Sequence, residues 1–283
     1  MDNFVKFLDG INGFIDKAIE FIGKKISGKV CDFLLLQFNK IYAPLILITI
    51  VLFLLNTLKL GFIYFLLSLI FAVPILLIFN YMGEKFHGAC KNLISANKTS
   101  LSDDAIMRLL SISYILGGIF FFLLSLVISA NSILYYSDFG FGFGEYILPF
   151  LLVGMWILSL LHFLATVPIA NPERINVQIS KDNTSAEDAI CILTLPLKIM
   201  LYFEELTSRL LIVSAAFLFI RFLLFSDNIS DYMMLGYAFA FLCIGLAYPL
   251  VIYFVFLIFN FWFSFMLSIL GVAKNISSGI SRK

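Results

Sequence analysis

The chain alternates long apolar runs with short polar segments. Six of the apolar runs are long enough to cross the hydrocarbon core of a bilayer, about 30 Å thick, as helices that rise about 1.5 Å per residue. We place these spans at residues 42–58, 60–82, 110–134, 146–169, 208–226 and 233–258. The pattern predicts an all-α integral membrane protein whose six transmembrane helices form three hairpins.

The last apolar run is the longest. Residues 232–273 carry no charge and could hold two spans. Two spans would place Lys274, Arg282 and Lys283 on the side opposite to the other basic residues. We therefore expect one long span, bent by Pro249, that continues into a tail at the membrane interface or in the cytosol.

Residues 1–41 contain an apolar stripe at helical spacing but no span. Its members recur at steps of four and three: Phe4, Leu8, Ile11, Ile15, Ala18 and Ile22. Such a stripe is typical of an amphipathic helix that lies in the interface, with a coiled-coil arm as the alternative. We expect residues 1–41 to form this N-terminal helix and residues 42–283 to form the membrane domain.

Two internal polar segments, 84–108 and 173–207, should lie in the cytosol. In the first, Ser102 is a good N-cap for a helix that begins with Asp103 and Asp104. In the second, residues 173–180 alternate polar with apolar and could be extended. Thr184-x-x-Glu187 is a capping box, and we expect its helix to run along the interface with a bend at Pro196.

The basic residues set the orientation. All 19 Lys and Arg residues except Lys59 and Arg221 fall in segments 1–41, 84–108, 173–209 and 274–283. Because Lys and Arg accumulate on the cytosolic side of membranes, both termini are predicted to be cytosolic. The setting would be a bacterial inner membrane or its equivalent.

Composition agrees with this membrane assignment and excludes other classes. The chain is 61% hydrophobic and 13% charged, so lipid must be its solvent. A net charge of +1 offers no basic face for nucleic acid. Four cysteines in a reducing compartment do not predict disulfides. His87 and Cys90 supply fewer ligands than a metal needs, and we expect neither metal nor cofactor.

Three short echoes suggest a repeated unit. They lie at residues 16–19, 103–106 and 187–190, and each is an acidic pair or Asp-Lys followed by Ala-Ile. Nearly constant spacing is what duplication leaves, but a match of four residues also arises by chance in a biased sequence. Both interpretations remain open.

One local pattern carries catalytic chemistry. Glu204-Glu205-x-x-x-Arg209 resembles the first motif of the CAAX-protease and bacteriocin-processing family of intramembrane glutamic proteases. The resemblance implies that carboxylates activate a water molecule to attack a peptide carbonyl. That family also needs histidines in later spans, and none follows Arg209 here. The alternative is a helix end whose Glu205 and Arg209 pair at i,i+4 spacing.

A second pattern lies in the loop between the third and fourth spans. Gly140, Gly142 and Gly144, in G-F-G-F-G-E, resemble the selectivity filter of potassium channels. A filter also needs a pore helix and a threonine-rich approach, which this loop lacks. An interfacial loop with aromatic anchors is the alternative.

Within the spans, ionisable chemistry is scarce. His162 is a candidate functional group, or a neutral imidazole bonded to a backbone carbonyl. Asn56, Asn80, Asn131 and Asn260 are candidates for hydrogen bonds between helices. No Asp or Glu lies at mid-depth, where coupled transporters usually keep one.

From this scarcity we expect a non-catalytic, multi-pass subunit or scaffold of a membrane complex, and therefore no enzyme. Its partners would be the lipid bilayer and homo- or hetero-oligomeric membrane proteins. A channel or transporter-like facilitator is the alternative, and an intramembrane hydrolase of the E-E-x-x-x-R type is the second alternative. The candidates for functional residues are Glu204, Glu205, Arg209, His162, Gly140, Gly142 and Gly144.

Overall fold

A computed structural model describes residues 13, 17, 20–135, 144–225 and 232–280 of the chain. Within them, six helical segments are long and apolar enough to cross a membrane, as the sequence predicted. The elements are η1 (Phe21–Ser27), α2 (Gly28–Leu60), α3 (Phe62–Leu67), η2 (Ser68–Ala72), α4 (Val73–Ala96), β1 (Thr99–Leu101), α5 (Ala105–Tyr135), α6 (Gly144–Ala170), η3 (Pro172–Ile175), β2 (Val177–Ile179), α7 (Ser185–Tyr202), α8 (Glu204–Phe225) and α9 (Tyr232–Ile280).

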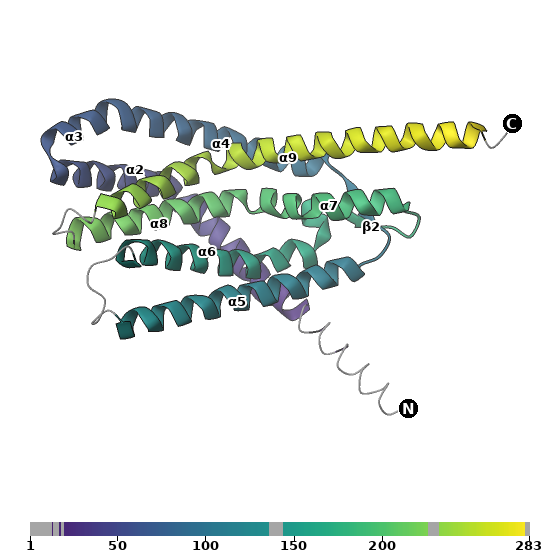
Figure 1. Cartoon of the computed structure of the whole chain (residues 1–283), viewed down its shortest axis with the longest axis horizontal. Coiled ribbons are helices and arrows are strands. Elements are labelled where there is room, and N and C mark those ends of the chain that lie inside the picture. Colours follow the sequence, from purple (N-terminus) through teal and green to yellow (C-terminus); the bar gives the residue numbers. More distant parts are fainter. Residues whose placement is uncertain (1–12, 14–16, 18–19, 136–143, 226–231, 281–283) are drawn as a thin grey trace.

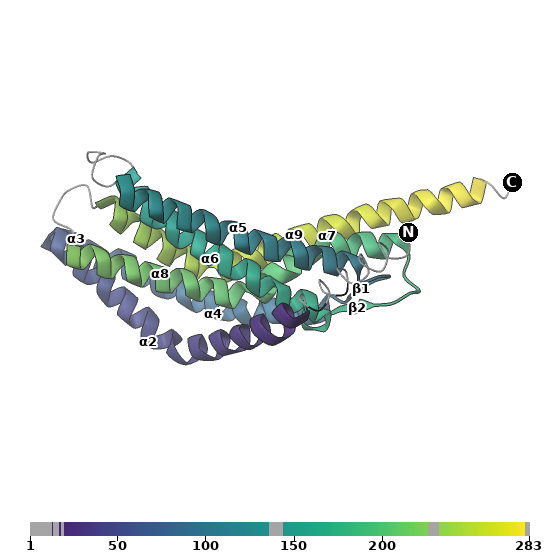
Figure 2. The same cartoon turned by 90° about the horizontal axis from the view of Figure 1, so that it is seen from below.

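The helices run along the long axis of the molecule as a bundle (Figure 1). One end carries α7 and the two strands, and we call it the strand end. In the view of Figure 2, α2 forms one side of the bundle and α5 the other, with α8 and α9 between them. α9 extends well past the strand end in both views.

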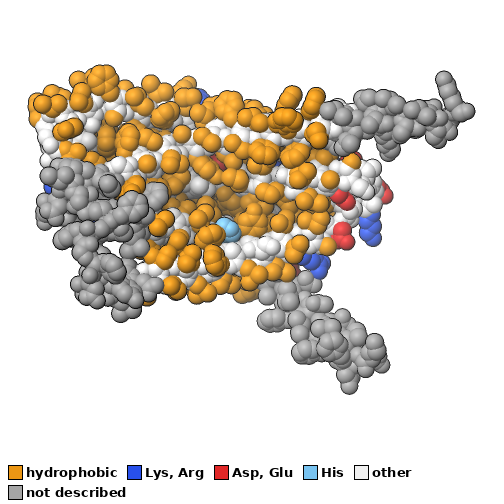
Figure 3. All heavy atoms as spheres, in the orientation of Figure 1, with side chains coloured by type: hydrophobic (Ala, Val, Ile, Leu, Met, Phe, Trp, Pro, Cys, Tyr) orange, Lys and Arg blue, Asp and Glu red, His pale blue; other side chains and the backbone are white. Residues whose placement is uncertain are grey.

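An apolar core joins α2, α8 and α9. It contains Ile46 and Phe53 from α2, Phe219 from α8, and Leu242 and Leu246 from α9, all buried. The outer surface is also apolar, as the face in Figure 3 shows, and most of its charged side chains lie near the strand end. A bundle that is apolar both inside and outside is expected of a protein whose solvent is lipid.

Backbone chemistry explains the irregular points. Gly61 turns the chain between α2 and α3 with φ of 142°, a conformation that side-chain-bearing residues avoid. The π-helical turn η2 ends two residues before Pro74, whose missing N–H and bulky ring disturb the preceding helical turn. The left-handed Asn176, with φ of 55°, ends η3 and begins the approach to β2.

Several boundaries differ from expectation. The expected division between residues 41 and 42 falls inside α2, which passes through it without a break. α7 and α8 follow one another along the bundle in nearly the same direction (Figure 1). Only Phe203 separates the two helices. α9 is one helix with Pro249 inside it, as expected for a single long span.

The fold is helical as predicted, apart from two three-residue strands that form a parallel pair at the strand end. The alternating segment after residue 173 contains β2, as expected, but its partner β1 was not predicted. Ser102 does not cap α5. It donates from its N–H and its hydroxyl to Asp188 of α7, and Asp103 accepts the N–H of Ala105 instead. The capping box of Thr184 and Glu187 is confirmed.

Candidate functional site

The acidic pair of the E-E-x-x-x-R pattern opens α8. Phe203 interrupts the helix between α7 and α8, so Glu204 and Glu205 occupy the first turn of a new helix. Carboxylates are favoured there because the N-terminal end of a helix carries partial positive charge. Both are buried, with 1% of Glu204 and 7% of Glu205 exposed.

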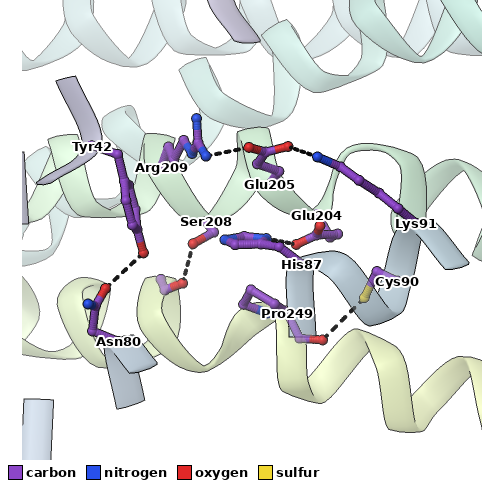
Figure 4. Close-up of polar contacts among 11 residues, drawn as sticks. Tyr42, Asn80, His87, Cys90, Lys91, Glu204, Glu205, Ser208, Arg209 and Pro249 are labelled. Atoms are coloured by element: carbon purple, nitrogen blue, oxygen red, sulfur yellow. Dashed lines mark hydrogen bonds and ion pairs between the residues drawn. The ribbon is translucent and has the colours of Figure 1, made fainter. Parts of the chain in front are cut away.

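Glu204 meets a histidine from another helix. Nδ1 of His87, on α4, lies 2.5 Å from Oε2 of Glu204, and the imidazole is itself buried (Figure 4). A buried carboxylate needs a donor or an opposite charge, because leaving it unpaired costs several kcal/mol, on the order of the desolvation of an ion. The pairing therefore fixes the position of His87 beside Glu204.

Glu205 bridges two cations. Its Oε2 lies 2.9 Å from Nζ of Lys91 on α4, and its Oε1 accepts from Arg209 one helical turn later. The Arg209 guanidinium also lies over the ring of Tyr42, 4.9 Å from its centroid, and Tyr42 donates to Asn80. The i,i+4 pair expected from the sequence is confirmed, as part of a larger network (Figure 4).

A proline on α9 explains the place of Ser208. Pro249 has no N–H, so it cannot donate to the carbonyl of Gly245 one turn earlier. Ser208 donates to that carbonyl at 2.6 Å, which satisfies the acceptor and ties α8 to α9. Gly83 brings α4 to the same place, since a Cβ there would lie 2.8 Å from the carbonyl oxygen of Leu246. Helices α4, α8 and α9 therefore meet tightly beside His87 and Glu204.

An open pocket of about 590 Å³ lies beside the two glutamates at the strand end. Its charged lining residues are Lys91, Glu173, Arg174, Glu204 and Glu205. The uncharged part of the lining includes Leu35 and Asn39 of α2 and Asn176, which precedes β2. The pocket is large enough for a segment of substrate, and it reaches a buried carboxylate that a histidine holds in place.

One wall of the pocket depends on Lys198 of α7, whose side chain is fully buried. Its Nζ donates to the carbonyls of Asn97 (2.5 Å) and Asn176 (3.3 Å) and to the hydroxyl of Thr99 (2.9 Å). Asn176 in turn donates to the carbonyls of Ile94 and Ser95 at the end of α4. Burial lowers the pKa of Lys198 to about 8.

Some buried polar atoms at the site have no hydrogen-bond partner within the described chain. They are Nε2 of His87 and the Nε and Nη1 atoms of Arg209. Buried polar groups are normally satisfied, so these unpaired atoms mark places where water can bind, although neither His87 nor Arg209 lines the pocket itself.

The other sequence candidates do not join this site. His162 donates from Nδ1 to the carbonyl of Leu158 at 2.7 Å and packs against Gly117, where a Cβ would lie 2.6 Å from its ring. It therefore joins α5 to α6. Gly140 and Gly142 lie outside the described residues, and Gly144 is the first residue of α6. Within the described ranges, no three His, Cys, Asp or Glu side chains are grouped as metal ligands.

Sequence reasoning did not find the role of His87 or Lys198. His87 lies before the E-E-x-x-x-R pattern, whereas the resembling family places its histidines after it. Only the pairing of α4 with α8 brings His87 to Glu204, across 117 positions of sequence. Comparison of the chain with protein-family models, curated proteins and solved structures gave no significant match. The function must therefore be argued from the site itself.

Proposed function

We propose that this protein is a membrane-embedded hydrolase that cleaves an acyl bond, amide or ester, at Glu204. The observation that carries the proposal is the 2.5 Å contact between His87 and Glu204 beside an open pocket. Perturbed and paired acid–base groups in a pocket are the usual sign of proton-transfer chemistry. The resemblance of the E-E-x-x-x-R pattern supports the same reaction, with His87 supplied from upstream.

In the proposed reaction Glu204 is the general base. It takes a proton from a water molecule as the water oxygen bonds to the substrate carbonyl carbon, and it then gives this proton to the leaving nitrogen or oxygen as the acyl bond breaks. His87 is a positioning residue that donates from Nδ1 to Glu204 and aims the free carboxylate oxygen. Lys91 supplies positive charge near the developing oxyanion, and Arg209 and Lys91 together hold Glu205.

With the basic segments in the cytosol, the site lies at the cytosolic boundary of the hydrocarbon core. His87 follows the uncharged run that ends at Gly83, and Tyr42 stands at the start of the first span. A substrate could then reach the pocket while part of it stays in the membrane, and water could reach it from the cytosol.

The test compares four proteins: wild type, Glu204→Gln, His87→Ala and Asp182→Asn. Each would be purified, reconstituted and added to membranes of a host that lacks the gene. New peptide termini and released carboxylic acids would be measured by quantitative mass spectrometry. Wild type and Asp182→Asn should give the same products, because Asp182 is exposed and does not line the pocket. Glu204→Gln should lose them by at least about 100-fold, and products that persist in Glu204→Gln would refute the proposal.

A second candidate function, a non-catalytic subunit of a membrane complex, is supported by α9. Its last described tie to the bundle is the hydrogen bond between Asn97 and Asn260. From this region onward α9 exposes a row of large apolar side chains: Phe259, Phe261, Trp262, Phe265 and Met266. Such a surface is unfavourable in water and is typical of a protein or membrane contact.

Extraction in mild detergent tests this second candidate. A subunit should be recovered in an assembly larger than one chain, and Glu204→Gln should leave its size unchanged. A monodisperse single chain would count against it. Activity without assembly would support the hydrolase alone.

A further inference from the structure

The pocket beside the two glutamates lies between two membrane-length helices that diverge. α2 and α4 are joined through α3 and η2 at one end of the bundle and separate toward the strand end (Figure 1). Tyr42 links them where it donates to Asn80 and packs edge-on against His87, and elsewhere the two helices are little in contact. Both then line the pocket, with Asn39 on α2 and Lys91 on α4 exposed. The pocket therefore opens at the side of the bundle, between helices that also expose large apolar side chains.

In the predicted topology, the pocket lies at the depth of the lipid headgroups. The uncharged run of the second span ends at Gly83, and Glu84, Lys85 and Lys91 follow it on α4. Charged side chains gather where a helix leaves the hydrocarbon core, because water and headgroups solvate them there. A lipid of the cytosolic leaflet therefore presents its phosphate and its ester bonds at the level of the pocket, while its acyl chains stay beside the helices.

The accessible walls of the pocket carry charges of both signs. The Lys91 side chain is 65% exposed although it contacts Glu205, and the Arg174 side chain is 35% exposed. Glu173 is exposed, and its carboxylate has no hydrogen bond or ion pair among the described residues. With the two buried glutamates counted, acidic residues outnumber basic ones in the lining. A headgroup with both a phosphate and an ammonium group would meet opposite charges here, whereas a purely anionic headgroup would be disfavoured.

We propose that the substrate is a membrane phospholipid whose headgroup carries an ammonium group, as ethanolamine phospholipids do. Lys91 and Arg174 supply positive charge for its phosphate, and Glu173 supplies negative charge for its ammonium group. This inference rests on the proposed hydrolase and names its substrate class.

The bond that breaks is an acyl ester of the lipid. A water oxygen bonds to the ester carbonyl carbon while Glu204 takes the water proton. The bond from this carbon to the glycerol oxygen then breaks, and Glu204 gives the proton to the glycerol oxygen. The products are a fatty acid and a lysophospholipid, so water is the only co-reactant.

Glu173→Gln is the sharpest variant for the test, because it removes the negative charge offered to the ammonium group and keeps the shape of the side chain. Asp182→Asn is the matched control, since it removes an exposed carboxylate that does not line the pocket. Both are made in the Glu204→Gln protein, which does not cleave the lipid under the proposed mechanism. Each protein is placed in nanodiscs of equal parts phosphatidylethanolamine and phosphatidylglycerol, and native mass spectrometry identifies the lipids that stay bound to it.

The Glu204→Gln parent should retain more phosphatidylethanolamine than phosphatidylglycerol. Glu173→Gln should lower this ratio about three- to fivefold relative to Asp182→Asn. Equal ratios in the two variants, or an excess of phosphatidylglycerol on the parent, would overturn the inference. Should Glu173→Gln not fold, a photo-crosslinking residue in place of Asn39 replaces it. Capture of phosphatidylethanolamine there supports the lipid site, and failure to capture it overturns the inference.

A further arm separates the lipid from free phosphoethanolamine, which carries the same phosphate and ammonium groups. At a concentration equal to that of the lipid, free phosphoethanolamine should leave the lipid bound, because the acyl chains hold the headgroup close to the pocket. Displacement of the lipid would overturn the assignment to a membrane lipid.

These outcomes are separable from those of the proposed function. A bound-lipid ratio that depends on Glu173, with no hydrolysis by the wild type, would keep the lipid site and remove the hydrolase. Products that are lost in Glu204→Gln but contain no lysophospholipid would keep the hydrolase and remove the lipid substrate.

Discussion

At the scale of single residues, the polar groups of the bundle are placed by what they can bond. Asn56 donates to the carbonyl of Phe219, Asn80 accepts from Tyr42, and Asn260 accepts from Asn97. The sequence predicted that these asparagines join helices, because an amide in an apolar bundle must find a partner. It could not name the partners, which lie between 38 and 163 positions away.

Lys198 leads to a prediction about pH. Its pKa falls from 10.5 to about 8 in the folded protein because burial disfavours the charged form. Between these values the unfolded chain keeps the proton and the folded chain loses it, so the free energy of unfolding should rise as pH rises from 8 to 10.5. The contribution of this residue is at most about 3 kcal/mol.

The measurement is unfolding in detergent mixtures at pH 7.5 and pH 9.5. Lys198→Met should lose this part of the pH dependence, and Lys181→Met, at an exposed lysine, should keep it. An identical pH dependence in wild type and Lys198→Met would show that the Lys198 proton is not linked to folding.

At the scale of elements, helix ends and prolines were easier to foresee than contacts. The capping box at Thr184, the single long α9 and the extended segment near β2 follow from local chemistry that a sequence displays directly. The strand β1 was missed because its residues, Thr-Ser-Leu, have no distinctive pattern and are extended only through β2. Ser102 was misassigned because its competing partner, Asp188, lies 86 positions away.

The tie between α8 and α9 gives a prediction at this scale. Ser208→Ala removes the side-chain donor to the Gly245 carbonyl, which Pro249 leaves without its usual helical N–H, so it should lower the free energy of unfolding by about 1–3 kcal/mol. The loss should shrink in Pro249→Ala, because an alanine N–H can donate to Gly245 within α9.

Ser214→Ala is the matched control for the tie. The Ser214 hydroxyl donates to the carbonyl of Leu210 within α8, and that carbonyl also accepts a helical N–H. Ser214→Ala should therefore lower the free energy of unfolding less than Ser208→Ala does. If Ser208→Ala lowered the free energy of unfolding equally in the wild type and in the Pro249→Ala protein, the contributions of Pro249 and Ser208 would be independent.

At the scale of the whole molecule, the apolar pattern predicted the number of membrane-length helices, because length and hydrophobicity are properties of sequence alone. The site could be predicted only in part. The motif identified Glu204, Glu205 and Arg209, but the pocket also needs residues of α2, α4 and η3 to meet them. Beyond Tyr42 the interior along α2 is filled by Ile46, Ile50 and Phe53. If the protein were a channel or a transporter-like facilitator, its solute would need another path through the bundle.

The positive-inside distribution predicts that both chain ends face the cytosol. Tags fused to the two termini should be inaccessible to a membrane-impermeant reagent in intact cells, whereas a cysteine placed in loop 138–145 should react. Labelling of one terminus but not the other would refute the six-span topology and the placement of the pocket.

The strand end also has a consequence for biogenesis. Lys198 bonds to Asn97 across 101 positions, and α5 and α6 lie between them in the chain. A ribosome that adds about 5–20 residues per second needs roughly 5–20 seconds to make that interval. During this time the nascent chain holds His87 and Lys91 without their glutamates. The insertion machinery therefore handles a protein whose proposed reactive centre is assembled only after most of its helices have been made.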